Sequence, residues 1–186
     1  MKAAAIIVTG LPASGKTTVA KKLAVELGWP FLDKDDFLEK LFEEYPVCSF
    51  DDRKQLSRLS DDLFQVKAEN LNNVVLVSHW KPRLGPTDTG TATEWIPDKF
   101  QTIIEVFCAC RTQIAMSRFK ARKRHPSHLD NSRTLKDVER QMISLVDGYP
   151  LNIGTTFSVN SEKPYDIEEL LRRIEATIMG MSSLQS

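Results

Sequence analysis

The sequence predicts a layered α/β domain with a largely parallel β-sheet. Short apolar runs rich in β-branched residues alternate with longer segments of helical period, which is the order that such domains show. With 186 residues, 41% of them apolar, the chain can bury a sizeable core without disulfides or a structural metal. We therefore expect a single domain over residues 1–180 and a frayed tail over residues 181–186.

The expected strands are short, and the helices between them are amphipathic. The strands are predicted at residues 4–9, 30–32, 74–78, 102–108 and 155–159. The helices are predicted at residues 16–27, 36–44, 51–71, 113–124, 134–146 and 166–178. Gly28 and Thr134 have the residue types of a helix C-cap and N-cap. For the helix that begins near Asp51 or Asp52, the pattern predicts a buried stripe of leucines and valine: Leu56, Leu59, Leu63 and Val66.

Composition excludes several classes of protein. The 25 Lys and Arg residues balance 25 Asp and Glu residues, which argues against a general polyanion binder because such proteins carry a basic excess. No apolar run is long enough to cross a bilayer, so no membrane association is expected. Three cysteines cannot pair completely, and this odd number fits a reducing, cytoplasmic location.

Residues 10–17 read Gly-Leu-Pro-Ala-Ser-Gly-Lys-Thr between the first strand and the first helix. This spacing is typical of a phosphate-binding loop, in which glycines let backbone N–H groups surround phosphates at a helix N-terminus. The lysine reaches phosphate oxygens, and the threonine hydroxyl serves Mg²⁺. The predicted nucleotide-binding residues here are Gly10, Pro12, Ala13, Ser14, Gly15, Lys16, Thr17 and Thr18.

An acidic turn follows the second strand. Asp33 and Asp35 stand at its carboxyl end, where ligands bind in open α/β sheets. Phosphoryl transfer to a hydroxyl needs a carboxylate to orient and deprotonate that hydroxyl, and acidic groups to hold water on Mg²⁺. The alternative is that these acids only cap the helix over residues 36–44.

Basic residues dominate residues 106–129, which contain no acid. Arg118 and Arg122 lie one helical turn apart, and irregular chain follows, so we predict a lid over about residues 118–133 that closes on nucleotide. A solvated basic helix face is the alternative. His125 and His128 belong to the same stretch, and a lid-packing role is favoured over contact with substrate.

No carboxylate follows the third strand. Ser78, His79, Trp80 and Lys81 come there instead, so the metal is assigned to Thr17 with Asp33 or water alone as its outer shell. Residues 79–97 are rich in Pro, Gly and Thr and are predicted to form an irregular acceptor loop. The predicted acceptor-binding residues, with ordinary loop packing as the alternative, are Asp33, Asp35, His79, Trp80 and Lys81.

Together these residues resemble the P-loop kinase superfamily of small phosphotransferases. That group includes shikimate and gluconate kinases, chloramphenicol phosphotransferase, the kinase module of polynucleotide kinase and the zeta toxins. The resemblance rests on residues 10–17, the Asp33-x-Asp35 pair and Arg118-x-x-x-Arg122. The run over residues 122–128 resembles an AAA-domain subgroup of predicted kinases.

The resemblance implies a three-layer fold in which helices flank a five-stranded parallel sheet and a helical lid closes over ATP. It also assigns roles, with Asp35 as the general base and Asp33 assisting the metal or the acceptor. The residues implied in catalysis are Lys16, Asp35, Arg118 and Arg122, and the two arginines also bind ATP. Shikimate kinases carry a glycine triplet where this sequence has Ser78-His79-Trp80, which counts against shikimate as the acceptor.

The favoured function is an ATP- and Mg²⁺-dependent kinase, monomeric or dimeric, that phosphorylates a hydroxyl of a small molecule. One alternative is a kinase for the 5′ end of a nucleic acid or for a nucleotide-sugar, in the manner of polynucleotide kinase or zeta toxin. A nucleotide-binding regulatory module is the less favoured alternative, because the guanine-reading and switch motifs of GTPases are missing.

Overall fold

Five parallel strands form the centre of the molecule in a computed structural model that describes residues 3–82 and 90–183, with the side chains of 181–183 left aside. The strands are β1 (Ala4–Thr9), β2 (Phe31–Asp33), β3 (Asn73–Val77), β4 (Thr102–Ala109) and β5 (Thr155–Asn160). Their order in the sheet is β2-β3-β1-β4-β5, and every neighbouring pair is parallel. The predicted α/β fold with five strands is confirmed.

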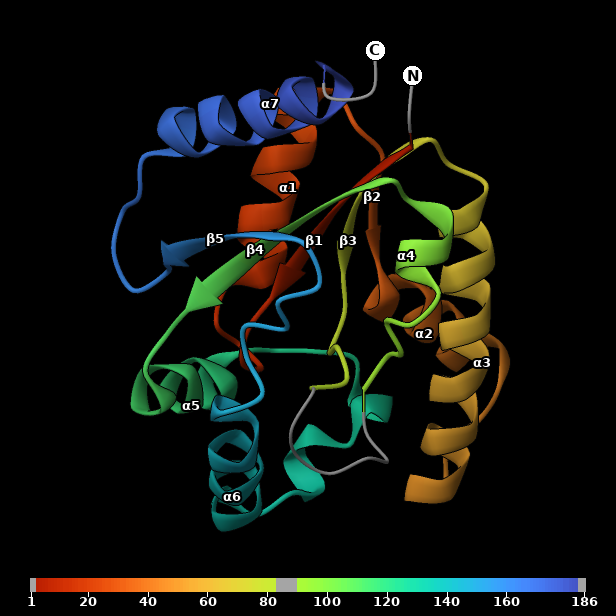
Figure 1. The fold of residues 1–186 in the computed structure, drawn as a ribbon. Coiled ribbons are helices and arrows are strands. Elements are labelled where there is room, and N and C mark those ends of the chain that lie inside the picture. The colour runs from red at the N-terminus through yellow and green to blue at the C-terminus, as the bar shows by residue number, and fades with distance from the viewer. Residues whose placement is uncertain (1–2, 83–89, 184–186) are drawn as a thin grey trace.

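Helices cover both faces of this sheet (Figure 1). On one face lie α1 (Lys16–Leu27) and α7 (Ile167–Ser183), and on the other α3 (Phe50–Glu69), α5 (Thr112–Ala121) and α6 (Leu135–Val146). The chain also forms α2 (Lys34–Glu44) and the short α4 (Ile96–Lys99). Strand β1 is buried on both sides, because Ala5 and Ile7 join one apolar cluster and Ile6 and Val8 the other.

The segments that follow the carboxyl ends of the strands gather at one edge of the sheet. The phosphate loop follows β1, and α2 starts directly at the end of β2. Beyond β4, α5 leads into two 3₁₀ turns, Pro126–His128 and Asp130–Ser132. Figure 1 shows these turns beyond the arrowheads of the sheet. Parallel strands bring distant segments to one edge in this way, which is where ligands bind.

Two predicted helix caps are confirmed. Gly28 has φ 65° and ends α1, with its N–H bonded to the carbonyl of Val25. At α6, the Thr134 hydroxyl accepts from the N–H of Asp137 at 3.2 Å. Of the predicted tail, residues 181–183 continue α7, and residues 184–186 lie outside the described part.

The helix α3 is present, but the prediction of which of its faces is buried is wrong. Ser49, not Asp51 or Asp52, caps the helix by accepting from the N–H of Asp52 at 3.1 Å. The face turned to the core carries Ser60, Phe64 and Ala68. The leucines and valine expected there are partly or largely exposed, namely Leu56, Leu59, Leu63 and Val66. Phe64 decides the rotation because its ring fills the space between Phe37 and Trp80.

Glu105 is a fully buried carboxylate in the middle of β4. It accepts from the Thr9 hydroxyl at 2.6 Å and from the backbone N–H groups of Leu151 and Asn152, both at 2.7 Å. A buried charge needs such a full set of donors to be tolerated. Glu105 therefore ties the loop before β5 to the end of β1, from which the phosphate loop continues.

Among the described residues, no helix combines the length and the apolar composition needed to span a bilayer.

Candidate active site

The loop between β1 and α1 has the backbone of a phosphate cradle. Gly10 and Gly15 have φ angles of 131° and 98°, and Ala13 is also left-handed at 60°. A Cβ atom on Gly10 would lie 2.7 Å from the carbonyl oxygen of Cys108, so the loop passes too close to β4 for a larger residue. Alternating left- and right-handed residues form concave rows of N–H groups that bind anions, here at the N-terminus of α1.

Two polar groups of this loop suit a bound phosphate. The Nζ of Lys16 folds back and donates to the carbonyl oxygens of Gly10 and Leu11 at 3.1 and 2.9 Å, and burial lowers the pKa of Lys16. The hydroxyl of Ser14 is buried and has no hydrogen-bond partner. A buried polar group without a partner is rare in folded proteins, so the loop fits the phosphates of a nucleotide.

Thr17 and Asp33 form the candidate magnesium site. The Thr17 hydroxyl donates to Asp33 Oδ2 at 2.9 Å, and Asp33 Oδ1 caps α2 by accepting from the N–H of Asp35 at 3.1 Å. Burial, with a smaller contribution from Asp35, raises the pKa of Asp33 to about 6. A cation beside Asp33 would offset this cost, and hydroxyl and carboxylate oxygens are ligands that Mg²⁺ prefers. The donor set therefore fits the ion.

That site is small. In the part of the chain that the structure describes, no three His, Cys, Asp or Glu residues come together as metal ligands. Mg²⁺ in proteins usually keeps several water ligands and binds phosphate oxygens of the substrate. One hydroxyl and one carboxylate from the protein are therefore sufficient protein ligands.

Asp35 faces Arg124, which belongs to the predicted lid of about residues 118–133. Its Oδ2 lies 2.6 Å from Nη2 of Arg124, while 48% of its side chain remains exposed. Burial acts to raise the pKa of Asp35, but the positive charges around it, Arg124 first, outweigh burial and hold the pKa below its usual range. At neutral pH the carboxylate is ionised and accessible, so it can accept a hydrogen bond from a hydroxyl.

The two arginines predicted for the lid lie in different places. Arg118 bridges the phosphate loop and the segment after β5, donating to the carbonyls of Ser14 at 3.5 Å and Ser161 at 2.9 Å. Arg122 lies 2.9 Å from Asp130, with its guanidinium 4.0 Å above the Phe119 ring. The sequence places the two on one helix face, but α5 ends at Ala121. The backbone turns there, so the two side chains diverge.

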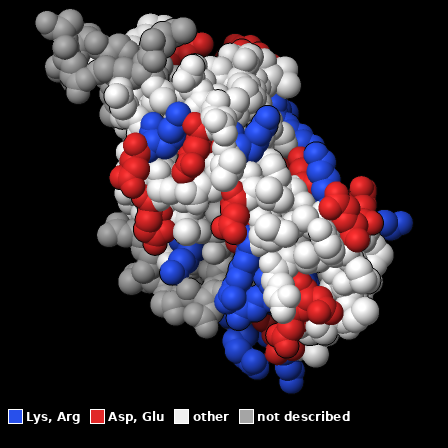
Figure 2. Space-filling view, turned by 90° about the vertical axis from the view of Figure 1, so that its right-hand side faces the viewer, with Lys and Arg blue, Asp and Glu red and all other residues white. Residues whose placement is uncertain are grey.

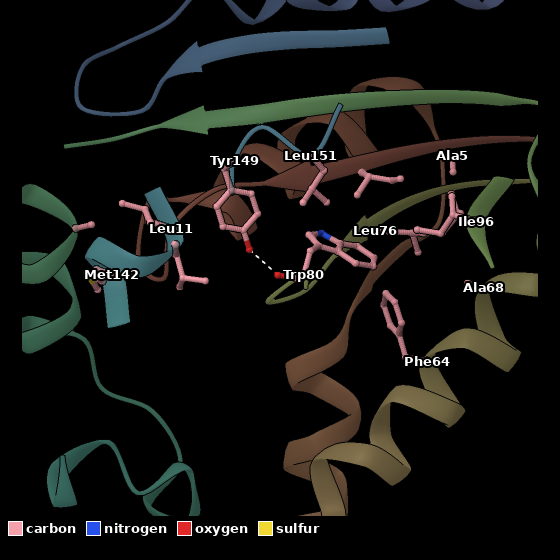
Figure 3. Packing of buried hydrophobic residues seen from close by; sticks show 14 of the residues in the cluster. Ala5, Leu11, Phe64, Ala68, Leu76, Trp80, Ile96, Met142, Tyr149 and Leu151 are labelled. Carbon is pink, nitrogen blue, oxygen red and sulfur yellow. Dashed lines mark hydrogen bonds between the residues drawn. The ribbon is translucent and has the colours of Figure 1, made fainter. Parts of the chain in front are cut away.

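The acceptor-loop prediction is wrong for Trp80. Its side chain is fully buried, its Nε1 donates to the carbonyl of Val8 at 3.0 Å, and its ring packs against Phe64. Figure 3 shows Trp80 between Phe64 and Tyr149, whose hydroxyl donates to the Trp80 carbonyl at 2.6 Å. Trp80 is therefore a core residue and cannot stack on a substrate.

Unlike Trp80, the neighbouring residues His79 and Lys81 are polar and do not belong to the apolar core. Both ring nitrogens of His79 are buried without a hydrogen-bond partner, and burial lowers its pKa to about 4. Lys81 is half-buried, and its backbone N–H donates to the Thr91 carbonyl at 2.9 Å. Thr91 also bonds the hydroxyl of Ser78, so part of the predicted irregular loop is held against β3. Residues 83–89 of that predicted loop lie outside the described residues.

The lid histidines pack on α2. His128 is fully buried with its Nε2 2.8 Å from Glu39 Oε1, and its ring meets Phe42 edge-on. The His125 ring stacks on Phe42 with centroids 5.4 Å apart. These contacts agree with the lid-packing role that the sequence favours, and they dock residues 125–128 beside the acidic turn.

Sequence reasoning missed three basic residues of the site. Arg124 pairs with Asp35, although the run of bases over residues 122–124 is visible in the sequence. Lys34 is buried and donates to the Ser57 hydroxyl at 2.6 Å. Arg53, in the first turn of α3, has a buried Nε without a partner. Arg53 and Lys34 give no sequence signal, because only the packing of α3 against α2 brings them together.

The parallel sheet in the order 2-3-1-4-5, with a phosphate loop after its central strand, defines a P-loop kinase fold. The chain belongs to the AAA domain family AAA_33, which it matches over residues 6–144, well over half of its length. The resemblance drawn from the sequence is thereby confirmed.

Curated relatives and solved structures agree with this fold. The chain is 32% identical over 102 residues to a "probable gluconokinase" from Xenopus tropicalis, covering 52% of this chain and 53% of that protein. It is 32% identical over 91 residues to shikimate kinase from Thermoanaerobacter pseudethanolicus, covering 45% of this chain and 49% of that protein. The chain thus spans about half the length of the curated relatives it matches.

Structural likeness extends over nearly all of the chain. A candidate kinase from Chloroflexus aurantiacus superposes with a TM-score of 0.74 at 22% identity, covering 97% of this chain and 98% of that one. Shikimate kinase from Acinetobacter baumannii, solved with shikimate, gives a TM-score of 0.56 at 16% identity, covering 98% of this chain and 96% of that one. At these identities the likeness shows the fold.

Proposed function

We propose that this protein is an ATP-dependent kinase that transfers the γ-phosphate to a hydroxyl group of a small molecule. The observation that carries the proposal is the link between the two functional turns, where the Thr17 hydroxyl lies 2.9 Å from Asp33 and Asp33 caps the helix that presents Asp35. A phosphate cradle and an accessible carboxylate are thereby joined through one metal-binding pair. Relatives named gluconokinase and shikimate kinase support the same class of reaction.

The phosphate side would work by charge neutralisation. Lys16 would leave the carbonyls of Gly10 and Leu11 to bind phosphate oxygens. Arg118, beside Ser14, and Arg122 would stabilise the transferring group. Mg²⁺ held by Thr17 and Asp33 would neutralise charge that develops on the phosphate oxygens.

The acceptor side would work by orientation. Because Arg124 holds the pKa of Asp35 down, Asp35 is a weak base and is better suited to align the acceptor hydroxyl than to remove its proton early. The proton would pass to Asp35 late, as the bond to phosphorus forms, which suits a loose transition state. Arg124 acts here as a positioning residue, since it fixes one carboxylate oxygen and leaves the other for the hydroxyl.

A nucleic-acid 5′ end receives less support as acceptor. Two arginines of the segment that would form its groove are paired internally, Arg111 with Glu162 at 2.8 Å and Arg122 with Asp130 at 2.9 Å. The face seen in Figure 2, on the α3 side, mixes acidic and basic side chains. Phosphate-backbone binding needs unpaired cations in a stripe.

The test is transfer of labelled γ-phosphate from ATP with Mg²⁺ to two acceptor pools. One pool holds small hydroxylated metabolites, and the other holds oligonucleotides with free 5′-hydroxyls. Label in the first pool is expected, and it should disappear in Asp35→Asn. Label confined to the second would replace the small-molecule acceptor by a nucleic-acid end. Nucleotide-dependent thermal stabilisation without label in either pool would support the regulatory-module alternative.

A further inference from the structure

The three consecutive residues of the acidic turn are tied to three different segments. Asp33 binds Thr17 of the phosphate loop, and Asp35 pairs with Arg124 of the predicted lid. The Nζ of Lys34 contacts α3 instead. The proposed reaction uses both carboxylates but not Lys34, although Lys34 is buried as well. Burial of an ammonium group is costly, so the contacts of Lys34 call for a reason of their own.

Lys34 joins the first turn of α2 to α3. Its Nζ donates to the Ser57 hydroxyl at 2.6 Å and lies 3.4 Å from Asp61 Oδ1. Only 10% of the Lys34 side chain and 29% of the Asp61 side chain are exposed. Ser57 and Asp61 are one helical turn apart, so both lie on the face of α3 that packs beside α2 (Figure 1). The carboxylate and the hydroxyl together allow the ammonium group to remain buried.

Asp61 also binds the segment that returns to β3. The Thr91 hydroxyl donates to Asp61 Oδ1 at 2.6 Å. Because that hydroxyl has a single proton, the Ser78 hydroxyl bonded to it is the donor in their contact. Ser78 directly follows β3, and both hydroxyl residues are buried. A continuous chain of polar contacts therefore runs from the end of β3 through Thr91 and Asp61 to Lys34.

The backbone of Thr91 is held as firmly as its side chain. Its N–H donates to the His79 carbonyl at 2.8 Å, and its carbonyl accepts from the N–H of Lys81 at 2.9 Å. At Gly90, φ is 104° and a Cβ atom would lie 2.6 Å from the Lys81 nitrogen, so the close approach of the two segments requires glycine. Thr91 therefore cannot move without moving residues 79–81.

The sheet gives the acidic turn little support. Strand β2 has three residues, lies at the edge of the sheet and pairs only with β3, where Asp33 is opposite Val77. Elements with few contacts open first in local unfolding. Reacting groups must be placed closely, because a displacement of about 1 Å can cost a factor of about 100 in rate. The bonds of Lys34 to α3 supply the fixation that a short edge strand lacks.

We propose that Lys34, Asp61 and Thr91 are positioning residues that hold the acidic turn and the segment after β3 in a fixed relation, so that Asp35 faces the acceptor hydroxyl. None of the three touches the reacting atoms in this assignment. It rests on the proposed kinase function and adds residues that act on the acceptor side alone, since the phosphate loop is tied to the turn separately, through Thr17.

The first experiment measures phosphate transfer to the acceptor found in the labelled-phosphate assay, for wild type, Thr91→Val and Thr91→Ser. Valine keeps the shape of threonine without its hydroxyl, whereas serine keeps the hydroxyl. In Thr91→Val, kcat/KM for the acceptor is expected to fall about 10- to 100-fold, the effect of a misplaced reacting group, while the KM of MgATP stays within about 2-fold. Thr91→Ser should restore most of the lost rate.

Thr93→Val is the matched control, because Thr93 belongs to the same segment and is less buried. It should equal wild type in both constants. If Thr91→Val weakens acceptor and MgATP equally, or if serine restores nothing, Thr91 supports the fold in general and the proposal is overturned. If wild type transfers no phosphate, the kinase function fails, and hydrogen exchange then decides on the connection itself.

A double-mutant cycle tests whether Lys34 and Thr91 act through the same carboxylate. Lys34→Met should also lower kcat/KM for the acceptor, and Lys34→Met/Thr91→Val should lose no more than about 2-fold beyond the more impaired single variant, because members of one network are not additive. Lys40→Met, at an exposed lysine of the same helix, should change neither wild type nor Thr91→Val. Losses that multiply in the double variant would mean two independent contacts and would contradict the proposal.

Hydrogen–deuterium exchange tests the connection without turnover. In Thr91→Val, the backbone N–H groups are expected to exchange about 10-fold faster both in residues 78–81 and in the first turn of α2, while β1 keeps its wild-type rates. Thr91→Ser and Thr93→Val should resemble wild type. Faster exchange confined to residues 90–96 would show a local role, and an equal increase in β1 would show a general loss of stability. Either result would overturn the proposal.

Asp61→Asn provides a second variant in case Thr91→Val does not fold. The amide oxygen can still accept from Thr91, but it no longer neutralises Lys34, so the same two segments should exchange faster. Asp62→Asn, at the neighbouring exposed carboxylate, is its control and should leave the exchange rates unchanged. Wild-type exchange at the acidic turn in Asp61→Asn would exclude a positioning role for the pair of Lys34 and Asp61.

Discussion

The two halves of the candidate active site are built differently. On the phosphate side, the polar groups come mainly from one continuous stretch, residues 10–18, in which Lys16 donates to two carbonyls of the loop itself. On the acceptor side, they come from α2, α3, the end of β3 and the lid, and several buried nitrogens have no partner. A phosphate is common to all nucleotide substrates, so a local motif can bind it. An acceptor is particular, and its receptor is assembled from distant segments.

The strongest test of the phosphate half is Lys16→Ala. Turnover is expected to fall about 10³- to 10⁵-fold, the range for a cation that neutralises a transferring phosphoryl group. Thermal stabilisation by MgATP should also be lost. The matched control is Lys21→Ala, an exposed lysine on the same helix, which should leave both measurements unchanged. Full turnover in Lys16→Ala would refute the phosphate cradle.

Asp35→Asn tests the acceptor half at its chemical centre. Turnover is expected to fall about 10²- to 10⁴-fold with little change in the affinity for MgATP, because Asp35 would act on the acceptor hydroxyl alone. Asp36→Asn alters the neighbouring exposed carboxylate and should have little effect. An unchanged rate in Asp35→Asn would indicate that Asp33 orients the acceptor instead. An equal loss of MgATP affinity would show that Asp35 also serves nucleotide binding, so that the two halves of the site are not separate.

Trp80 marks the boundary between acceptor loop and core. Trp80→Ala is expected to lower the free energy of unfolding by about 3–5 kcal/mol, as for other buried tryptophans, measured by urea denaturation. Trp95→Ala, at a partly exposed tryptophan, should cost less. Trp80→Phe keeps most of the buried ring, and the KM for the acceptor should stay within about 2-fold. A 10-fold higher KM for the acceptor in a folded Trp80→Phe variant would show that Trp80 contributes to acceptor binding after all.

Asp33→Asn is expected to give the smallest effect. The variant should increase the free energy of unfolding while it lowers Mg²⁺-dependent turnover. The pKa of Asp33 is about 6 in the folded chain against 3.8 in the unfolded one. Between these pH values the folded state binds more protons, so its stability falls as pH rises to about 6 and stays lower above it. Without Mg²⁺ and nucleotide, Asp33→Asn should therefore gain about 1–3 kcal/mol at pH 7.5 and nothing at pH 4.

The same variant should lose Mg²⁺-dependent turnover, because the amide replaces a carboxylate beside Thr17. Asp36→Asn serves as the control in both measurements, at an exposed carboxylate of the same helical turn. A destabilised Asp33→Asn at pH 7.5 would show that its cap on α2 outweighs the cost of the buried charge.

Sequence patterns were reliable where one local property decides the structure. The strands β1 and β3, the caps at Gly28 and Thr134 and the left-handed phosphate loop all follow from neighbouring residues. They were unreliable where two patterns compete. On α3 the leucines form a regular stripe, yet Phe64 fills the core and leaves Leu59 and Leu63 partly exposed. Burial of one large ring outweighs a spread of smaller contacts.

By itself, the sequence determined the parallel α/β fold, the phosphate loop and the acidic turn, because alternation of apolar runs and the spacing of glycines act over a few residues. Only the tertiary structure decided which arginine meets Asp35, that Arg53 and His79 keep buried nitrogens without partners, and that Trp80 belongs to the core. These outcomes depend on contacts between segments far apart in the chain. No local pattern encodes such contacts, since they arise from the packing of α3 and the lid against α2.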